Sequence, residues 1–282
     1  MKLSVIGILI ILNNISFALL LRFFRGNSYK FDRYLSNMYE IDTNPPKAIS
    51  CFAAARNKGP ILEILKKVVD STEFNKKTCI KVLEIASGTG EHASYFSSEV
   101  SNLLYLPTYL NSEVESKWRK KYSPDEQPQN SYDMKGSIEA WTDLSREQLS
   151  DKNSDILQPI QLDVEDFDVK HLPNQMEAGT INLLICINMI HITPFSCTES
   201  LFKLASQILD TSGVVLTYGP YKINNFMVES NIAFDLSLKA RNSEWGIRAV
   251  EEVEKVANSY NIVLETKYEM PANNLCLVFR KV

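Results

Sequence analysis

Apolar residues along the chain follow two alternating spacings, which predict short buried strands separated by amphipathic helices. Six apolar runs predict strands at 80–86, 159–164, 181–188 and 214–218, and a closing hairpin of 262–268 with 275–278. Helical spacing predicts helices at 60–69, 91–96, 201–209 and 247–256, the first led by Pro60 and the third ended by Gly213. Continuous apolar strands that alternate with helices are typical of a parallel sheet covered on both faces. The pattern therefore predicts an α/β fold.

Two segments depart from this pattern. Residues 101–157 are polar with weak periodicity, so we expect one strand and one helix there and a polar insertion at about 101–135. Leu3–Leu21 is almost wholly apolar and lies between Lys2 and Arg22. Such a run is typical of a cleaved signal or organelle leader, of a retained membrane anchor, or of a plain extension of a cytoplasmic protein. We expect residues 1–50 to form this leader or anchor with a linker, residues 3–21 to be the candidate for membrane or translocon contact, and residues 51–282 to form one domain.

Composition narrows the function classes. The chain is 45% hydrophobic and 23% charged, with a net charge of −4, which suits an ordinary globular domain. Because no basic footprint is visible, we expect no nucleic-acid partner. The five cysteines are scattered without a C-x-x-C pair, so neither a disulfide framework nor a metal site is expected. Cys186 and Cys276 lie in apolar runs and are expected to be buried thiols.

A glycine-rich turn joins the strand at 80–86 to the helix at 91–96. Glycine tolerates positive φ and a close backbone approach to a ligand, and the first N–H groups of a helix are free to bind one. Glu84 ends the strand four residues before Gly88, where a carboxylate suits a cationic partner such as the amino group of S-adenosylmethionine. A dinucleotide is an alternative because Ala93 is tolerated in its fingerprint, although Glu84 would then lie near the pyrophosphate. A plain tight turn is the structural alternative for Gly88 and Gly90.

Three later strand ends bring further chemistry to the same predicted edge of the sheet. Asp163 is a candidate acceptor for an adenine amino group, or a cap for the next turn. Asn188 is a candidate contact for substrate or cofactor, and His191 is either a general base or a structural histidine. Tyr218 opens a Tyr-Gly-Pro-Tyr run that predicts a substrate lid or a rigid turn. If the acceptor must lose a proton, the candidate bases are His191, Asp235 and Tyr218, in that order.

The run Leu83–Phe96 resembles the cofactor motif of class I S-adenosylmethionine-dependent methyltransferases. More narrowly, the chain is similar to the methyltransferase-like protein 26 family over about residues 52–282, except for 101–135. The matching segments are Ala55–Lys58 with Pro60–Leu62, Leu162–Val164, Leu184–His191, Thr217–Tyr221, Asn231–Leu236, Arg241–Asn242 with Glu244–Gly246, and Met270–Asn274.

This resemblance implies a doubly wound, Rossmann-like sheet of seven strands, mostly parallel, with the last strand antiparallel. It also implies S-adenosylmethionine as the cofactor and methyl donor, but it supplies no acceptor. Carried over by position, the cofactor contacts would be Glu84, Ala86, Gly88 and Gly90 at the methionine end, Asp163 with Val164 at the adenine, Asn188 with Met189 beside the sulfonium, and Arg56 with Asn57 closing over the pocket from an N-terminal helix.

One departure from the family concerns the ribose of the cofactor. Relatives carry a Gln-Pro-Ser-Asp run after the second strand, and its acid would bind the ribose hydroxyls. Here we expect Gln127–Asn130 in that place, so Asn130 would make a weaker contact, unless Asp125 or Asp133 substitutes. We therefore expect a methyltransferase for a small-molecule or protein acceptor. The alternatives are a non-catalytic binding module on the same fold and a nicotinamide-dependent oxidoreductase.

Overall fold

The structure, a computed structural model, describes residues 39–41, 48–71, 74, 76–110, 134–146, 149 and 153–282. The strands are β1 (Tyr39–Ile41), β2 (Ile49–Cys51), β3 (Ile80–Ile85), β4 (Leu103–Tyr109), β5 (Asp155–Ile156), β6 (Ile160–Gln161), β7 (Ile181–Ile187), β8 (Leu209–Gly219), β9 (Tyr221–Lys222), β10 (Arg248–Ala249), β11 (Ile262–Met270) and β12 (Asn274–Lys281). The α-helices are α4 (Phe52–Val69), α5 (Glu91–Glu99), α7 (Met134–Arg146), α8 (Phe195–Ile208), α9 (Glu229–Arg241) and α10 (Val250–Ser259). Short 3-10 helices are η1 (Val169–His171), η2 (Asn174–Met176), η3 (Ile190–Ile192) and η4 (Pro271–Asn273).

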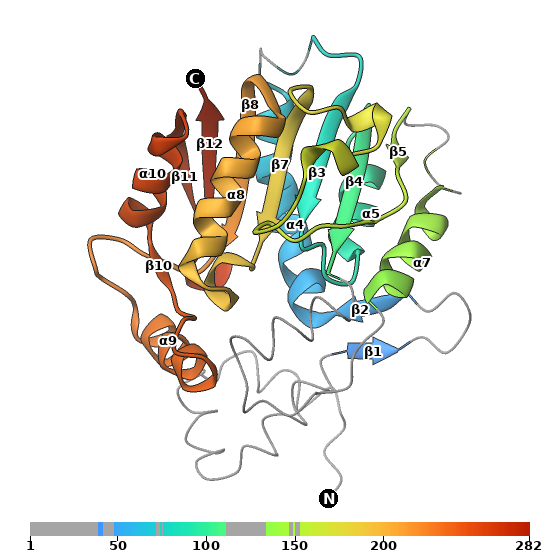
Figure 1. Cartoon of the computed structure of the whole chain (residues 1–282). Helices are drawn as coiled ribbons and strands as arrows, with labels where there is room; N and C mark the ends of the chain where they lie inside the picture. The colour runs from blue at the N-terminus through green and yellow to red at the C-terminus, as the bar shows by residue number, and fades with distance from the viewer. Residues whose placement is uncertain are drawn as a thin grey trace, which may run out of the picture.

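One large sheet organises the molecule. Its strands follow the order β11-β12-β8-β7-β3-β4-β5, and the short β6 pairs with the end of β4. β3 is parallel to both β4 and β7, and β7 is parallel to β8. The last strand, β12, is antiparallel to β8 and to β11 (Figure 1). The prediction of a mostly parallel seven-stranded sheet with an antiparallel last strand is therefore confirmed.

Helices cover both faces of this sheet, and each face has its own core. Side chains of α8 and α10 pack on one face with Leu83 of β3, whereas α4 and α5 pack on the other face with its neighbour Val82 (Figure 1). Successive strand residues point to opposite faces, which is why one apolar strand serves two cores. This explains the continuous apolar runs in the sequence.

Two predicted element boundaries are wrong. Pro60 does not begin its helix but lies inside α4, which starts eight residues earlier at Phe52. A proline inside a helix lacks the N–H that would bond the carbonyl four residues back, so the helix must be held there by other contacts. Gly213 does not end a helix: α8 stops at Ile208, and Gly213 lies inside β8 after Ser212, whose φ is 67°.

Among the described residues of the polar region 101–157, two strands belong to the main sheet, β4 and the two-residue β5. β4 is wedged between β3 and β5, so the second parallel strand begins within the expected insertion. The helix expected in this region is α7, whereas the strand expected at 159–164 is reduced to the two residues of β6.

Helix α9 was not predicted and lies beyond the carboxyl edge of the sheet (Figure 1). In the part of the chain that the structure describes, no helix has both the length and the apolar character needed to cross a bilayer. Leu3–Leu21 lies outside that part.

Candidate functional site

The glycine-rich turn after β3 is held in an unusual backbone conformation. Ala86, Gly88 and Gly90 all have positive φ, at 54°, 57° and 91°. Thr108 of β4 fixes the turn: its hydroxyl donates to Glu84 O (2.8 Å) and accepts from Ala86 N (3.1 Å). Its backbone N–H donates to Ser87 Oγ (3.0 Å). Sequence reasoning missed Thr108, although it follows Pro107 at the end of a strand. Because a neighbouring strand anchors it, the turn is preformed rather than shaped by a ligand.

The two glycines of this turn have different roles. A Cβ added at Gly88 would meet nothing within 4 Å, so the backbone there borders open space. A Cβ added at Gly90 would lie 2.9 Å from Ile138 Cα of α7. Gly90 is therefore required where a helix approaches, whereas Gly88 leaves room at the start of α5, where free N–H groups suit an anion or a polar ligand.

Glu84 is buried rather than exposed at the strand end. Glu84 is 1% exposed, and burial raises the pKa of its carboxyl group to about 7, against the lowering effect of the nearby hydroxyl groups of Ser87 and Tyr105. By strict geometry, Glu84 Oε2 and the Tyr105 hydroxyl have no hydrogen-bond partner within the described residues. The Tyr105 hydroxyl therefore lies near the Glu84 carboxyl group but is poorly aligned to donate to it. An unpaired buried carboxyl oxygen at this edge fits a ligand that brings a cationic donor.

The second parallel strand ends much earlier than the ribose prediction assumed. β4 stops at Tyr109, which is half-buried and accepts a bond from Leu162 N through its carbonyl (2.9 Å). Asn130 lies outside the described residues, as does Gln127, so the proposed ribose contact stays a prediction. Tyr109 is the residue found directly at this strand end, and the sequence analysis did not single it out.

Asp163 and Val164 follow β6 and lie partly exposed beside the end of β4. One carboxylate oxygen of Asp163 accepts from Glu165 N at 3.0 Å, so Asp163 caps the following turn. Its other oxygen makes no bond recorded among the described residues, so the cap and an adenine contact are compatible.

The ends of β7 and β8 bring three predicted residues together. Asn188 has a left-handed φ of 59°, and its N–H donates to Tyr218 O at 2.8 Å. A Cβ added at Gly219 would come within 3.2 Å of His191 Nδ1 and 3.6 Å of Asn188 Oδ1, so this glycine makes room for both side chains. Met189, next to Asn188, is 7% exposed. Asn188 and His191 therefore lie side by side at the ends of β7 and β8, next to the buried Met189.

The candidate bases on this edge have unfavourable protonation properties. Burial, together with Arg241 and Arg248, lowers the pKa of His191 to about 3. Burial also raises the pKa of Tyr218 above its usual range, although Arg56 and hydrogen bonds with Asn274 and Asn57 oppose the shift. A general base works best when its pKa lies near the working pH, and neither group meets that condition. Both are better suited to donating or accepting a fixed hydrogen bond.

Asp235 of α9 is engaged in structural contacts. One carboxylate oxygen accepts from Ile247 N at 2.7 Å, and the other pairs with Lys239 Nζ at 2.6 Å. The side chain is buried, and Gly246 passes so close that a Cβ there would lie 2.9 Å from Asp235 Oδ1. The contacts of Asp235 therefore anchor α9 to the segment before β10.

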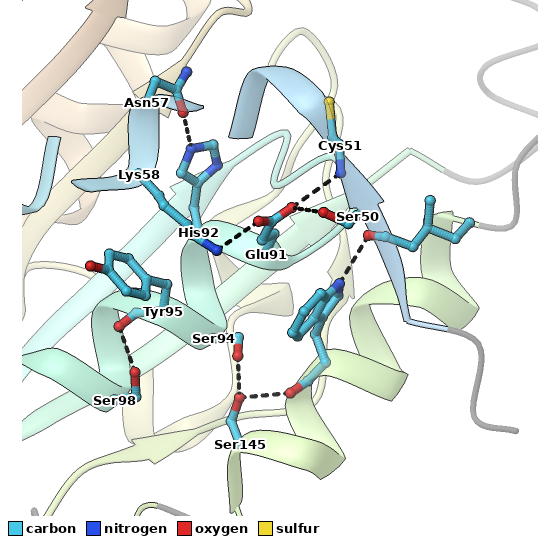
Figure 2. A network of polar contacts seen from close by, with 12 residues as sticks. Ser50, Cys51, Asn57, Lys58, Glu91, His92, Ser94, Tyr95, Ser98 and Ser145 are labelled. Atoms are coloured by element: carbon cyan, nitrogen blue, oxygen red, sulfur yellow. Dashed lines mark hydrogen bonds and ion pairs between the residues drawn. The ribbon is translucent and has the colours of Figure 1, made fainter. Parts of the chain in front are cut away.

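Arg56 and Asn57 come from α4, which crosses the start of α5. Asn57 Oδ1 lies 2.7 Å from His92 Nε2 (Figure 2). The guanidinium of Arg56 lies 5.5 Å from the centre of the Phe52 ring. Asn57 is 6% exposed, and both residues lie near enough to Tyr218 of β8 to lower the pKa of its hydroxyl. Helix α4 therefore contacts the start of α5 through Asn57 and lies near the end of β8, while the cofactor contacts of Arg56 and Asn57 stay a prediction.

Strand β2 is attached to the same turn through α7. Ile49 N donates to Ser137 Oγ at 3.0 Å, and Ser137 Oγ donates to Thr89 O at 2.9 Å. Trp141 Nε1 donates to Ile49 O at 3.0 Å (Figure 2). The glycine turn is therefore enclosed by β2 and α7 as well as by β4.

Comparison with known proteins identifies the family. The model of a family described as "Protein of unknown function (DUF938)" matches residues 49–126 and 117–281, and the chain belongs to this family. The narrower similarity to methyltransferase-like protein 26 stays a prediction.

Several solved structures share the fold. A putative O-methyltransferase from Nostoc punctiforme PCC 73102 is 12% identical, with a TM-score of 0.54 over 79% of this chain and 56% of that one. An O-methyltransferase family protein from Burkholderia thailandensis is 12% identical, with a TM-score of 0.53 over 81% of this chain and 57% of that one. LepI in complex with SAM is 12% identical, with a TM-score of 0.50 over 77% of this chain and 46% of that one. This chain spans about half the length of these structures, and at such low identity the similarity shows the fold alone.

Proposed function

We propose that this member of the DUF938 family is an S-adenosylmethionine-dependent methyltransferase whose acceptor is a small molecule or a protein. The observation that carries the proposal is the preformed turn at the start of α5, with Gly88 bordering open space and a buried, unpaired oxygen of Glu84 beside it. The methyltransferase fold of the structural neighbours supports it.

In this proposal, the residues at the sheet edge bind and orient. Glu84 receives the amino group of the cofactor, and the turn around Gly88 offers backbone N–H groups to its carboxylate. Asp163 and Val164 flank the adenine, while Asn188 and Met189 lie at the sulfonium. When bound, S-adenosylmethionine supplies an electrophilic methyl group.

The acceptor side of the site works by positioning rather than by strong acid–base chemistry. His191 is neutral at physiological pH, because its pKa is about 3, and Tyr218 keeps its proton. Holding an acceptor atom in line with the methyl carbon supplies much of the rate without a proton transfer. Acceptors that are already nucleophilic at neutral pH suit this edge best.

Isothermal titration with S-adenosylhomocysteine tests the proposal. We expect saturable heat at micromolar ligand, and loss of that heat in Gly88→Val, whose side chain would fill the open space. A wild-type protein that releases no heat at high micromolar ligand would rule the proposal out.

A non-catalytic binding module on the same fold is the second candidate. It is favoured by the unsuitable pKa values of His191 and Tyr218 and by the structural bonds of Asp235. Transfer of a labelled methyl group to any component of a metabolite or protein extract would eliminate this candidate. Binding of S-adenosylhomocysteine without such transfer would favour it.

A further inference from the structure

Helices α4 and α5 are joined at the glycine turn by two consecutive residue pairs. Lys58 Nζ lies 2.8 Å from Glu91 Oε1, and Asn57 Oδ1 lies 2.7 Å from His92 Nε2 (Figure 2). Glu91 and His92 are the first two residues of α5 and directly follow Gly90. Asn57 and Lys58 are likewise adjacent on α4. We refer to these four residues as the α4–α5 clamp.

The Glu91 carboxylate also accepts hydrogen bonds from residues that precede α4. Its Oε2 accepts from Ser50 Oγ at 3.0 Å and from Cys51 N at 3.1 Å, both at the end of β2. Figure 2 shows these donors and Lys58 converging on one carboxylate. The Glu91 side chain is 2% exposed, so it is a buried charge whose compensation depends on these partners. Removing the partner of such a charge leaves the charge uncompensated and is strongly destabilising.

His92 determines how the Asn57 amide is turned. Burial lowers the pKa of His92 to about 4, so the imidazole is neutral at physiological pH. A neutral ring can bond the Asn57 carbonyl oxygen only if it carries its proton on Nε2, so we assign that tautomer. With its oxygen engaged by His92, Asn57 has only its NH₂ group left to face the nearby Tyr218 hydroxyl, whose pKa it lowers.

A second ion pair between the same helices provides a contrast. Lys66 and Glu99 lie 4.0 Å apart at the other end of α5, with both side chains about 40% exposed (39% and 41%). This pair contributes to helix adhesion but is remote from the glycine turn, and an exposed pair is worth little. Simple attachment of α4 to α5 therefore does not require a buried Glu91 and His92 next to Gly90.

We propose that Glu91 and His92 are positioning residues, which hold α4 across the glycine turn and orient Asn57 toward Tyr218, so that binding at the turn and the geometry of the acceptor edge are linked. This inference rests on the proposed function, because it assumes that the ligand of the turn is S-adenosylmethionine. Neither residue needs to touch the acceptor: each acts through its partner on α4.

Titration of full-length variants with S-adenosylhomocysteine tests the clamp. We expect Glu91→Gln and His92→Leu to bind about tenfold more weakly, which corresponds to roughly 1.4 kcal/mol. His92→Gln retains an N–H donor for Asn57, so it should stay within about threefold of the wild type. Glu99→Gln, the matched control on the same pair of helices, should bind as the wild type does. If Glu91→Gln does not fold, Lys58→Met replaces it, because Lys58 is the partly exposed partner of Glu91. We expect the same tenfold loss of affinity.

A spectroscopic measurement separates positioning from general stability. The chain has three histidines, so the His92 signals in a ¹⁵N-imidazole spectrum can be assigned by their loss in His92→Gln. We expect an Nε2–H tautomer at pH 7 that does not titrate until about pH 4. A His92 proton on Nδ1, or full affinity of His92→Leu in a wild-type background that binds ligand, would overturn the clamp. If the wild type itself binds no S-adenosylhomocysteine, the proposed function fails instead, and the two failures are thereby distinguished.

Discussion

At the residue scale, the buried carboxyl group of Glu84 controls how the protein responds to pH. Its pKa of about 7 exceeds the value of 4.5 for an unhindered glutamate because burial disfavours the charged form. The folded state therefore holds a proton that the unfolded chain releases between these two values. Stability from the protonated form is fully present below pH 4.5 and is lost as the pH rises through 7.

Substituting Glu84 by glutamine should reverse this loss. Since one pKa unit corresponds to about 1.4 kcal/mol, the raised pKa of Glu84 changes the free energy of unfolding by up to roughly 3 kcal/mol between low and high pH. We expect Glu84→Gln to gain stability relative to the wild type as the pH rises from 5 to 8. Urea unfolding at both pH values measures this, with the exposed Glu99→Gln as the control. An equal stability difference at pH 5 and pH 8 would contradict the assignment.

The same carboxyl group should make ligand binding depend on pH. A cationic amino group binds only the ionised form of Glu84, and this form is scarce below pH 7. We expect the affinity for S-adenosylhomocysteine to fall toward about tenfold per pH unit as the pH drops below 7. Glu84→Gln should bind more weakly at pH 8 and show a flat profile. If the wild-type affinity is constant between pH 6 and 8, Glu84 does not bind the amino group of the ligand.

At the scale of elements, the close approach of α7 to the glycine turn predicts unequal effects for two similar substitutions. Gly90→Ala combines a positive φ with a Cβ 2.9 Å from Ile138 Cα, whereas Gly88→Ala has the positive φ alone. We expect a loss of about 1 kcal/mol for Gly88→Ala and roughly 2–4 kcal/mol for Gly90→Ala. Urea unfolding compares the two variants. Equal losses would mean that α7 yields to the added methyl group without cost.

The buried carboxylate of Asp235 is one of the anchors of helix α9, which gives another prediction at this scale. Asp235→Ala leaves Ile247 N without its acceptor and should lower the free energy of unfolding by about 1–3 kcal/mol. Asp235→Asn keeps an oxygen for Ile247 N and should lose less. If Asp235 acts instead as a base, both variants would keep their stability and lose methyl transfer alike.

The sequence predicted those elements whose residues are buried on both faces along most of their length. β7 and the core of β8 are buried on both faces, so their residues form apolar runs that stand out. α9 was missed because its buried positions include Asn231 and Asp235, while Ile232 and Leu236 are exposed. Its arrangement depends on polar partners elsewhere in the chain, and no local pattern encodes them.

The candidate site was predictable to a similar extent. The turn at Gly88 and the strand end at Asn188 were found because strand, turn and helix follow one another locally. The burial of Glu84, the Thr108 anchor and the clamp at Glu91 arise from contacts between distant segments. Spacing along the chain therefore indicated where to expect a ligand site but not how the side chains there are protonated or held.

At the scale of the whole molecule, buried cysteines lie in both cores of the sheet, so their reactivity measures whether each core is intact. All five are described and free: Cys186, Cys197 and Cys276 are buried, Cys79 is exposed, and Cys51 is intermediate. Cys186 belongs to the core under α8 and α10, and Cys276 to the core under α4 and α5. Burial raises the pKa of both thiols to about 12, so neither forms the reactive thiolate in the folded protein.

Thiol labelling with an aromatic disulfide reagent at pH 8 should therefore proceed in separate steps. We expect Cys79 to react first, Cys51 more slowly because it lies against the clamp, and the three buried thiols only on unfolding. Cys79→Ser, the control, should remove the fast step alone. In increasing urea, Cys186 and Cys276 should become reactive at the same concentration, because a sheet shared by two cores cannot lose one helical layer and keep the other dry. Earlier labelling of Cys276 than of Cys186 would show instead that the α4–α5 layer, with the glycine turn that it encloses, opens as an independent unit.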